Sequence, residues 1–169
     1  MTFSPAEKLT SEHETSDFDC GRPELNDWLR RFALVNESAG GTRTFVTCPI
    51  GTKTVAGYYA LAAGSIEHSD ASQRIGSGLA RHPIPVIVLA RLAVDSRYAG
   101  QGLGSALLKD ALLRADRASD EIGVRAVLVH SKDDNAKRFY ERYDFEQSPA
   151  DALQLMVLMK DVRRILRGR

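Results

Sequence analysis

Apolar residues recur at helical spacing in the first part of the chain. They lie three or four positions apart, as on one face of an amphipathic helix: Leu25, Trp28, Leu29, Phe32 and Val35. Pro23 suits the opening turn of a helix, and Gly40 with Gly41 suits its end. We therefore expect one amphipathic helix between these signals, with the apolar side chains on its core-facing side.

The next apolar stretches have the character of strands. Residues 42–48 and 54–63 form two such runs, separated by a short turn-rich segment at 49–52. This arrangement is typical of a hairpin, so the two strands are expected to be antiparallel neighbours. Residues 64–83 are polar, contain three glycines and lack clear periodicity, which indicates a loop with room for one helical turn.

From residue 85 onward, buried strands alternate with helices. Residues 86–94 form a nearly unbroken apolar run, interrupted only by Arg91, as expected for a central strand buried on both faces. A glycine-rich segment follows, and an apolar stripe then marks a helix: Leu103, Leu107, Leu108, Ala111, Leu112 and Ala115. The sequence further predicts a strand at 124–130, a short helix at 135–143 and a last strand at 153–159 before a basic tail. This order indicates an α/β fold with a mixed sheet.

Length and composition fit a single domain over residues 1–169. The chain has 43% hydrophobic and 27% charged residues, and a domain of this size buries roughly 70% of its unfolded surface without help from a metal or a disulfide. Cys20 and Cys48 show no metal-binding spacing, and they suggest reduced thiols in a reducing compartment. The acidic N-terminus has no apolar run, and no stretch is long enough to span a membrane. We expect a cytoplasmic protein without a metal site.

The formal net charge of +1 conceals a segregation of charge along the chain. Segments 1–30 and 110–150 carry −4 and −2, whereas segments 31–109 and 151–169 carry +4 and +3. A local basic patch could bind a polyanion, although solvated surface arginines would give the same pattern. The charge alone leaves both readings open.

The glycine-rich segment has the features of an anion site. Gly100, Gly102 and Gly104 stand between a predicted buried strand and the start of a helix, where backbone N–H groups and the helix dipole favour negative charge. The expected ligand is a phosphate or a pyrophosphate group. The spacing matches neither a Walker loop nor a dinucleotide fingerprint, and taken alone the glycines could also mark a simple turn.

Two segments resemble the motifs of the GNAT family of N-acetyltransferases. VLARLAVDSRYAGQGLGSALL resembles the acetyl-coenzyme A loop that follows a bulged strand, and the later NAKRFYERYDF resembles the family's Asn-to-Tyr-to-Gly-Phe segment. Ala99 stands where the family usually has Gln or Arg, and Asp144 replaces a usual Gly, which Asp tolerates because it can adopt a left-handed turn. The resemblance implies a GNAT fold with a mixed, mostly antiparallel central sheet and flanking helices, and it implies acetyl-CoA as the acetyl donor.

Upstream segments extend the resemblance to a narrower group. HETSDFDCGRPELNDWLRRFALVNESAGGTRTFV, VAGYYALAAGSI and PVIVLARLAVD are similar to the TacT- and AtaT-like acetyltransferase toxins of type II toxin-antitoxin systems. This similarity implies acetylation of the α-amino group of aminoacyl-tRNA, a block of translation and neutralisation by a ribbon-helix-helix antitoxin. It also implies a possible homodimer. The alternatives are an N-acetyltransferase for a small amine or a protein N-terminus, and a degenerate coenzyme A-binding regulator.

The resemblance also assigns roles to individual residues. It implies that the backbone of the loop holds the pyrophosphate, at Gly100, Gln101, Gly102, Gly104 and Ser105. It also implies that two residues of the preceding strand, Ala93 and Val94, pair with the pantetheine arm. Asn135 would contact the cofactor. Tyr140 would be the general acid that protonates the departing thiolate, while Phe139 and Tyr143 are assigned to the core. In the alternative interpretation, all three aromatic residues simply pack in the core.

No residue is singled out as a strong base. An α-amine has a pKa of about 8, against about 10.4 for lysine, so an aminoacyl acceptor needs little help in losing its proton. Glu67 and Asp95 are carboxylates that could serve, but Asp95 closes a strand before a loop and is expected to form a cap or turn. Three histidines are not singled out by the spacing of any partner residue in the sequence: His68, His82 and His130.

Several arginines could meet the phosphates of an RNA. Arg91, Arg43 and Arg81 are the candidates for substrate binding, and Arg91 lies just before the expected bulge, although a structural ion pair would also explain it. Weaker candidates for the same patch are Arg74, Arg163, Arg164 and Arg167.

Overall fold

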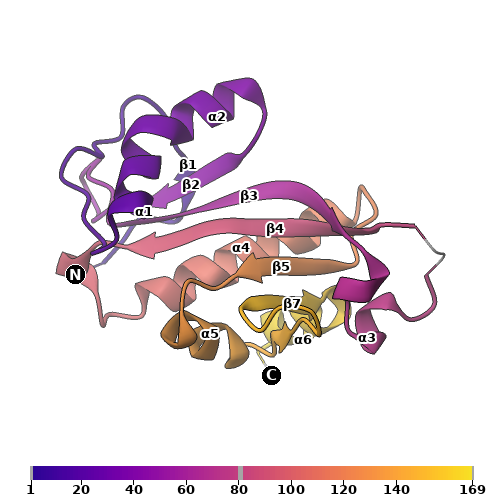
Figure 1. Ribbon diagram of the computed structural model, residues 1–169. Coiled ribbons are helices and arrows are strands. Elements are labelled where there is room, and N and C mark those ends of the chain that lie inside the picture. Colours follow the sequence, from indigo (N-terminus) through magenta and orange to yellow (C-terminus); the bar gives the residue numbers. More distant parts are fainter. Residues whose placement is uncertain (1, 80–81, 169) are drawn as a thin grey trace. The chain divides into compact units, whose positions relative to one another are not determined.

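The computed structural model describes residues 2–79 and 82–168, and its central feature is a mixed sheet of seven strands (Figure 1). The strands occur in the spatial order β1-β2-β3-β4-β5-β7-β6, with β4 and β5 parallel and the other recorded pairs antiparallel. Their bounds are β1 (Glu7–Lys8), β2 (Arg43–Thr47), β3 (Gly57–Ile66), β4 (Ile84–Val94), β5 (Ala126–His130), β6 (Glu146–Gln147) and β7 (Gln154–Leu158). The predicted α/β class with a mixed, mostly antiparallel sheet is therefore confirmed.

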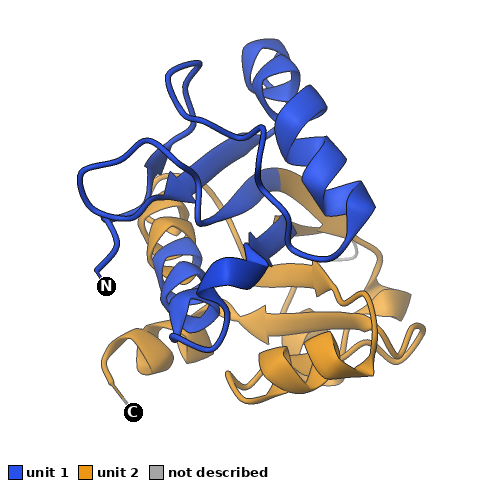
Figure 2. Ribbon diagram, turned by 90° about the vertical axis from the view of Figure 1, so that its left-hand side faces the viewer, with its two compact units in different colours: residues 1–62, 90–111 blue, residues 63–89, 112–169 orange. Residues whose placement is uncertain are grey.

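Residues group into two compact units, which Figure 2 colours separately. Unit 1 comprises residues 1–62 and 90–111, and unit 2 comprises residues 63–89 and 112–169. Three elements contribute to both units: β3, β4 and the helix α4 (Leu103–Ser119).

The first helix of unit 1 begins and ends where the sequence predicts, but its buried face is different. It consists of α1 (Pro23–Asp27), the π-helical turn η1 (Trp28–Phe32) and α2 (Ala33–Ala39), and it is capped by Gly40 in a left-handed conformation at φ 78°. The wider π turn takes in one extra residue, so the buried stripe passes from Leu29 to Ala33 instead of Phe32. Phe32 and Val35 are 46% and 64% exposed, and their expected place on the core-facing side is wrong.

Both faces of the unit 1 strands are covered by helices. The predicted hairpin is confirmed, because β2 and β3 pair antiparallel from Arg43 opposite Leu61 to Thr47 opposite Gly57. One face packs against α1 and η1 through a cluster that includes Leu25, Trp28, Leu29, Val46, Tyr58 and Ala60 (Figure 1). The other face receives the start of α4 so closely that a Cβ on Gly57 would lie 2.8 Å from Leu107 Cδ1. Gly57 therefore allows the helix to approach the sheet.

Unit 2 is built around β5. This strand pairs parallel with β4 from Ala126 opposite Val86 to Val129 opposite Leu89, and antiparallel with β7 on its other side. A core cluster on one face includes Ile66, Ile75, Ile84, Val86, Leu128 and Met156. The remaining helices of the unit are α3 (Gln73–Gly76), α5 (Asp134–Glu141) and α6 (Met159–Leu166).

Two segments of unit 2 differ from the sequence prediction. The segment expected to be a loop is more ordered, since β3 continues to Ile66 and is followed by the 3-10 turn η2 (His68–Asp70) and then by α3. The basic tail is a helix, α6, because its apolar residues Met159, Val162 and Ile165 recur every three positions and are buried. The charged residues between them conceal this pattern: Lys160, Asp161, Arg163 and Arg164.

A buried aspartate in unit 1 holds the segment that leads into the glycine-rich loop. Asp95 is 1% exposed and caps the short helix η3 (Ser96–Tyr98), because its Oδ1 accepts from the N–H of Arg97 at 2.9 Å. The Arg97 guanidinium donates to both carboxylate oxygens at 3.0 Å, and the Asp19 N–H donates to Oδ2 at 3.1 Å. The backbone N–H of Asp95 also donates to Ala56 O at 2.8 Å. One residue thus ties together the N-terminal segment, the residue before β3 and the loop.

These hydrogen bonds set the charge state of the aspartate. Burial raises the pKa of Asp95, but the hydrogen bonds from Arg97 and from the Asp19 backbone outweigh burial, and its pKa lies below the usual value. The carboxylate therefore stabilises the fold in its ionised form. The expectation that Asp95 forms a cap is confirmed.

We expect Asp95→Ala to lower the free energy of unfolding by about 3 kcal/mol at pH 7, because it removes charge-assisted bonds and leaves buried N–H donors unpaired. Since the folded-state pKa is lowered, the stabilisation is complete above the unfolded pKa of about 3.9 and is lost as the pH falls through the folded-state value. Urea unfolding of wild type and Asp95→Ala should show a difference in the free energy of unfolding that becomes smaller below about pH 4. The exposed-site control Asp120→Ala should stay within about 0.5 kcal/mol of wild type, and an Asp95 effect no larger than that would contradict the assignment.

Candidate active site

The glycine-rich loop of unit 1 joins η3 to the 17-residue helix α4. Gly100 and Gly102 have positive φ angles of 78° and 80°, which L-residues rarely adopt, and nothing lies within 4 Å of a Cβ built on either residue. Gly104 lies inside the first turn of α4 and is half-buried. Gly100 and Gly102 therefore serve the path of the chain and leave the loop surface open.

Backbone donors are concentrated at this junction. The N–H groups of residues 100–105 make no hydrogen bond to any residue that the structure describes, and residues 99–102 are exposed. Free N–H groups at the start of a long helix, together with the helix dipole, bind anions. The loop, including Gln101 and Ser105, therefore offers backbone donors suited to a phosphate or pyrophosphate group, and these donors do not depend on the side chain at Ala99.

The second half of β4 offers an unpaired strand edge to an extended ligand. The parallel ladder with β5 ends at Leu89, and β4 continues for five residues to Val94. Within this stretch Ala93 is buried, whereas Val94 and its other neighbours are half-buried, so the expected burial on both faces is wrong for this half of the strand. An exposed edge of this kind can pair with the amide groups of a pantetheine arm.

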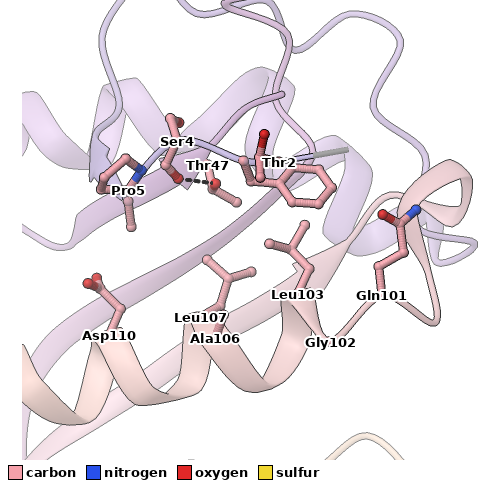
Figure 3. Close-up of a pocket in the computed structure, with 12 residues that line it drawn as sticks. Thr2, Ser4, Pro5, Thr47, Gln101, Gly102, Leu103, Ala106, Leu107 and Asp110 are labelled. Carbon is pink, nitrogen blue, oxygen red and sulfur yellow. Dashed lines mark hydrogen bonds between the residues drawn. The ribbon is translucent and has the colours of Figure 1, made fainter. Parts of the chain in front are cut away.

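A pocket of about 420 Å³ in unit 1 adjoins the loop (Figure 3). Its wall consists of the N-terminal segment, the end of β2 and one side of α4: Thr2, Phe3, Ser4, Pro5, Ala6, Thr47, Gln101, Gly102, Leu103, Ala106, Leu107 and Asp110. The Thr47 hydroxyl donates to Ser4 O at 2.6 Å, and the Tyr59 hydroxyl donates to the Asp110 carboxylate. The sequence analysis missed this pocket because the N-terminal residues carry no pattern that links them to α4.

In unit 2, Tyr140 has a buried ring and a free hydroxyl. The residue is 6% exposed, and burial raises the pKa of its phenol, which therefore stays protonated at neutral pH. Its hydroxyl forms no hydrogen bond within the described ranges, whereas the buried tyrosines of unit 1 are both satisfied, Tyr58 by Leu25 O at 2.8 Å and Tyr59 by Asp110. A protonated phenol without a protein partner is available to donate to a ligand.

The segment around Tyr140 partly matches the sequence prediction. Asp133 caps α5 by accepting from the Ala136 N–H at 2.9 Å, and Asn135 is exposed in the first turn. Phe139 and Tyr143 are half-buried and contact each other at 5.7 Å between ring centroids. Asp144 has a φ of 66°, so the left-handed turn expected at this position is confirmed.

The candidate arginines differ in whether their charge is already neutralised. Arg91 lies over the ring of Trp28, with 4.7 Å between its Cζ and the ring centroid, and no carboxylate contacts it among the residues that the structure describes. Arg43 is exposed but forms an ion pair with Glu37 at 2.8 Å, and Arg81 lies outside the described residues. Three of the weaker candidates also have acidic partners: Arg74 and Arg164 with Asp161, and Arg163 with Asp116. Arg167 is exposed and has no acidic partner within the described ranges either, so Arg91 is the half-buried candidate whose charge is uncompensated.

The other polar candidates do not form a cluster of known chemistry. Glu67, His68 and His82 line a pocket of about 420 Å³ in unit 2, and His130 is exposed at the end of β5. Residues 2–79 and 82–168 contain no group of three side chains able to hold a metal ion, and Cys20 and Cys48 are both free thiols. Across the same ranges no helix has the length and hydropathy required to cross a membrane.

Comparisons with known proteins agree with this geometry. The profile of the acetyltransferase (GNAT) domain family matches residues 50–156. The chain is 48% identical over 164 residues to the tRNA-acetylating toxin of Mycobacterium tuberculosis (strain ATCC 25618 / H37Rv), and the match covers 97% of each protein.

Solved structures share the fold over nearly the whole chain. AtaT complexed with acetyl-methionyl-tRNAfMet has a TM-score of 0.89 at 24% identity, with 97% of this chain and 99% of that chain covered. A tyrosine-to-phenylalanine mutant of AtaT, bound to the C-terminus of the antitoxin AtaR and to acetyl-CoA, has a TM-score of 0.83 at 24% identity, with 99% and 100% covered. At these identities the likeness establishes the fold.

The profile match covers more than half of the chain, the sequence relative is similar along almost its whole length, and the loop before α4 presents the free backbone donors that an acetyl-CoA site needs. This chain belongs to the GNAT family of acetyl-CoA-dependent N-acetyltransferases.

Proposed function

We propose that this protein transfers the acetyl group of acetyl-CoA to the α-amino group of aminoacyl-tRNA, blocks translation in this way and is neutralised by an antitoxin. The observation that carries the proposal is the run of free N–H groups at the start of α4, in a chain that is 48% identical to a tRNA-acetylating toxin. The acceptor class comes from this relative, and the donor class is that of the family.

The acetyl donor is proposed to lie on elements of unit 1. The backbone of Gly100, Gln101, Gly102, Gly104 and Ser105 would hold the pyrophosphate, and the exposed edge of β4 at Ala93 and Val94 would pair with the pantetheine arm. Acetyl-CoA supplies the acetyl group as an activated thioester. In unit 2, the exposed Asn135 is the proposed further contact to the cofactor.

Tyr140 is proposed to be the general acid. Its hydroxyl would donate a proton to the coenzyme A sulfur as the carbon–sulfur bond breaks, leaving a neutral thiol. The proposal is supported by the match of Tyr140 to the family motif, by its raised pKa and by the absence of a hydrogen-bond partner for its hydroxyl within the described chain.

The acceptor amine needs no dedicated base in this proposal. An α-amine with a pKa of about 8 is partly neutral at physiological pH, so it can attack the thioester carbon and release its proton to water. Asp95 is engaged as a cap and carries no role as a base. Arg91 is the proposed contact to RNA, with Arg43 and Arg81 as further candidates, although Glu37 already neutralises the charge of Arg43.

The cellular setting is part of the same proposal. A cytoplasmic location follows from the substrate, because charged tRNA serves ribosomes there. We propose a ribbon-helix-helix antitoxin as the neutralising partner, a homodimer as the assembly and one catalytic domain over residues 1–169.

We expect Gly102→Val to weaken acetyl-CoA binding by about tenfold or more, because the side chain would keep the pyrophosphate away from the N–H donors, and charged hydrogen bonds contribute about 1.5–3 kcal/mol each. Gly51→Val is the matched control, since Gly51 has the same left-handed backbone at φ 84° and nothing within 4 Å of its Cβ position. Isothermal titration calorimetry should show a loss for Gly102→Val only. Equal affinity in both variants would contradict the site.

We expect Tyr140→Phe to reduce turnover by about 10²- to 10⁴-fold, the usual contribution of a general acid, with acetyl-CoA affinity unchanged. The fold should keep its stability, because the hydroxyl has no partner to lose within the described residues. Tyr143→Phe is the control and should turn over like wild type. If Tyr140→Phe reaches wild-type turnover at saturating substrates, another group is the acid.

We expect labelled acetyl-CoA to modify charged tRNA but not deacylated tRNA. Because phosphate contacts supply much of the binding, kcat/KM should fall steeply with salt, whereas a small-amine substrate would show little dependence. Mass spectrometry after nuclease digestion should place the acetyl group on the α-amine of the esterified amino acid. Absence of labelling in a full pool of charged tRNA would favour a small amine or a protein N-terminus as the acceptor.

A further inference from the structure

Arg91 is a charged residue that the fold does not neutralise. It is half-buried in the second half of β4, and one Nη1–H donates to its neighbouring backbone oxygen, Ala90 O, at 3.2 Å. Within residues 2–79 and 82–168 no carboxylate forms an ion pair with it, and Trp28 provides its ring contact. A partly desolvated cation without a counter-charge is unfavourable unless something else compensates it.

A column of rings fixes the position of the guanidinium. The Trp28 ring stacks on Tyr58 at 5.9 Å between centroids with an angle of 11° between the planes, and Phe18 meets Tyr58 edge-on at 5.5 Å. Tyr58 is fully buried and its hydroxyl is held by Leu25 O. The guanidinium over Trp28 is the last member of this column, and it is the member that is not fully buried.

The column places a planar cation beside the proposed path of the acetyl donor. Arg91 is two residues from Ala93 on the same strand, which corresponds to about 6.6 Å along β4 and to the same face of the sheet. A guanidinium that rests on an aromatic ring can accept another planar group on its remaining face, and RNA-binding proteins use this arrangement to stack bases. A phosphate contact would use the edge of the guanidinium and would not require the indole beneath it.

We propose that Arg91 is a stacking platform for the terminal adenine of the acceptor RNA. This inference rests on the proposed function, because the amino acid of every charged tRNA is esterified to that adenosine. By stacking the base, Arg91 would position the ester-linked amino acid for attack on the thioester. Arg91 is thus a specificity-determining residue that reads the base next to the reacting amine.

The proposal can be tested with two charged acceptor-stem minihelices, one ending in adenosine and the other in an abasic ribose. Wild type should favour the adenosine end by about tenfold or more in kcat/KM, the range of base stacking on planar side chains. Arg91→Lys keeps the positive charge but loses the planar guanidinium. Its ratio of kcat/KM between the two minihelices should therefore fall to about one, while the dependence of kcat/KM on salt concentration stays unchanged. Arg117→Lys, on an exposed site of α4, is the matched control and should retain the preference. A preference retained in Arg91→Lys, or absent in wild type, would overturn the proposal.

A second measurement does not depend on catalysis. Trp28 is the single tryptophan of the chain, so its fluorescence reports directly on the column below Arg91. Uncharged adenosine-ended minihelix should change the emission saturably in wild type and in Arg117→Lys, but not in Arg91→Lys, and the abasic minihelix should change none of them. Identical titrations with both minihelices in wild type would overturn the proposal.

The two measurements separate the two hypotheses. If the charged minihelix is not acetylated but the fluorescence difference is present, the proposed acceptor is wrong and the stacking stands. If acetylation proceeds without any preference for the adenosine end and without a fluorescence difference, the acceptor stands and the stacking is wrong. Circular dichroism of Arg91→Lys, with a thermal melt like that of wild type, verifies that the variant is folded.

Discussion

The Asp95 carboxylate is the interaction on which the geometry of the loop depends. It is buried, ionised and bonded to groups from both the N-terminal segment and the turn that precedes the glycines. Because these donors converge on one charged group, the chain leaves β4 in a fixed direction, and the N–H groups of residues 100–105 are in place before any ligand arrives. Preorganised donors bind an anion more tightly than flexible ones, because the loss of entropy on ordering them occurs during folding and not during binding.

In both units, the polar groups of interest are either held by protein partners or left without one. Tyr58, Tyr59 and Asp95 have protein partners and act as parts of the framework. Among the described residues, the loop N–H groups and the Tyr140 hydroxyl have no hydrogen-bond partner, and the Arg91 guanidinium has no charged partner and one hydrogen bond, to Ala90 O. The family motifs pointed to the loop and to Tyr140, whereas Arg91 was singled out because it is the one charged residue within an apolar strand.

Local patterns predicted most of the framework, and tertiary contacts decided the remainder. The β2–β3 hairpin, the strand–loop–helix unit around residue 100 and the left-handed Asp144 follow from turn residues and periodicity. The two-residue strands β1 and β6 are too short to leave a pattern, and α6 is concealed by its charged residues. Charge pairing was the hardest to foresee, because partners such as Asp116 and Arg163 are far apart in the sequence and meet only in the fold.

The π-helical turn between α1 and α2 shows how one residue can change a protein's surface while its core stays the same. The extra residue is absorbed within five positions, so the helix still ends at Gly40 and the strand that follows keeps its register. Beyond the turn, however, every side chain is rotated by about 100° compared with an uninterrupted helix. Phe32 and Val35, which an uninterrupted helix would place on the core-facing side, are 46% and 64% exposed for this reason. The number of residues between Trp28 and Ala33 therefore decides which side chains of α2 are exposed to solvent. Relatives that differ there by one residue would share the fold but expose different side chains on this helix.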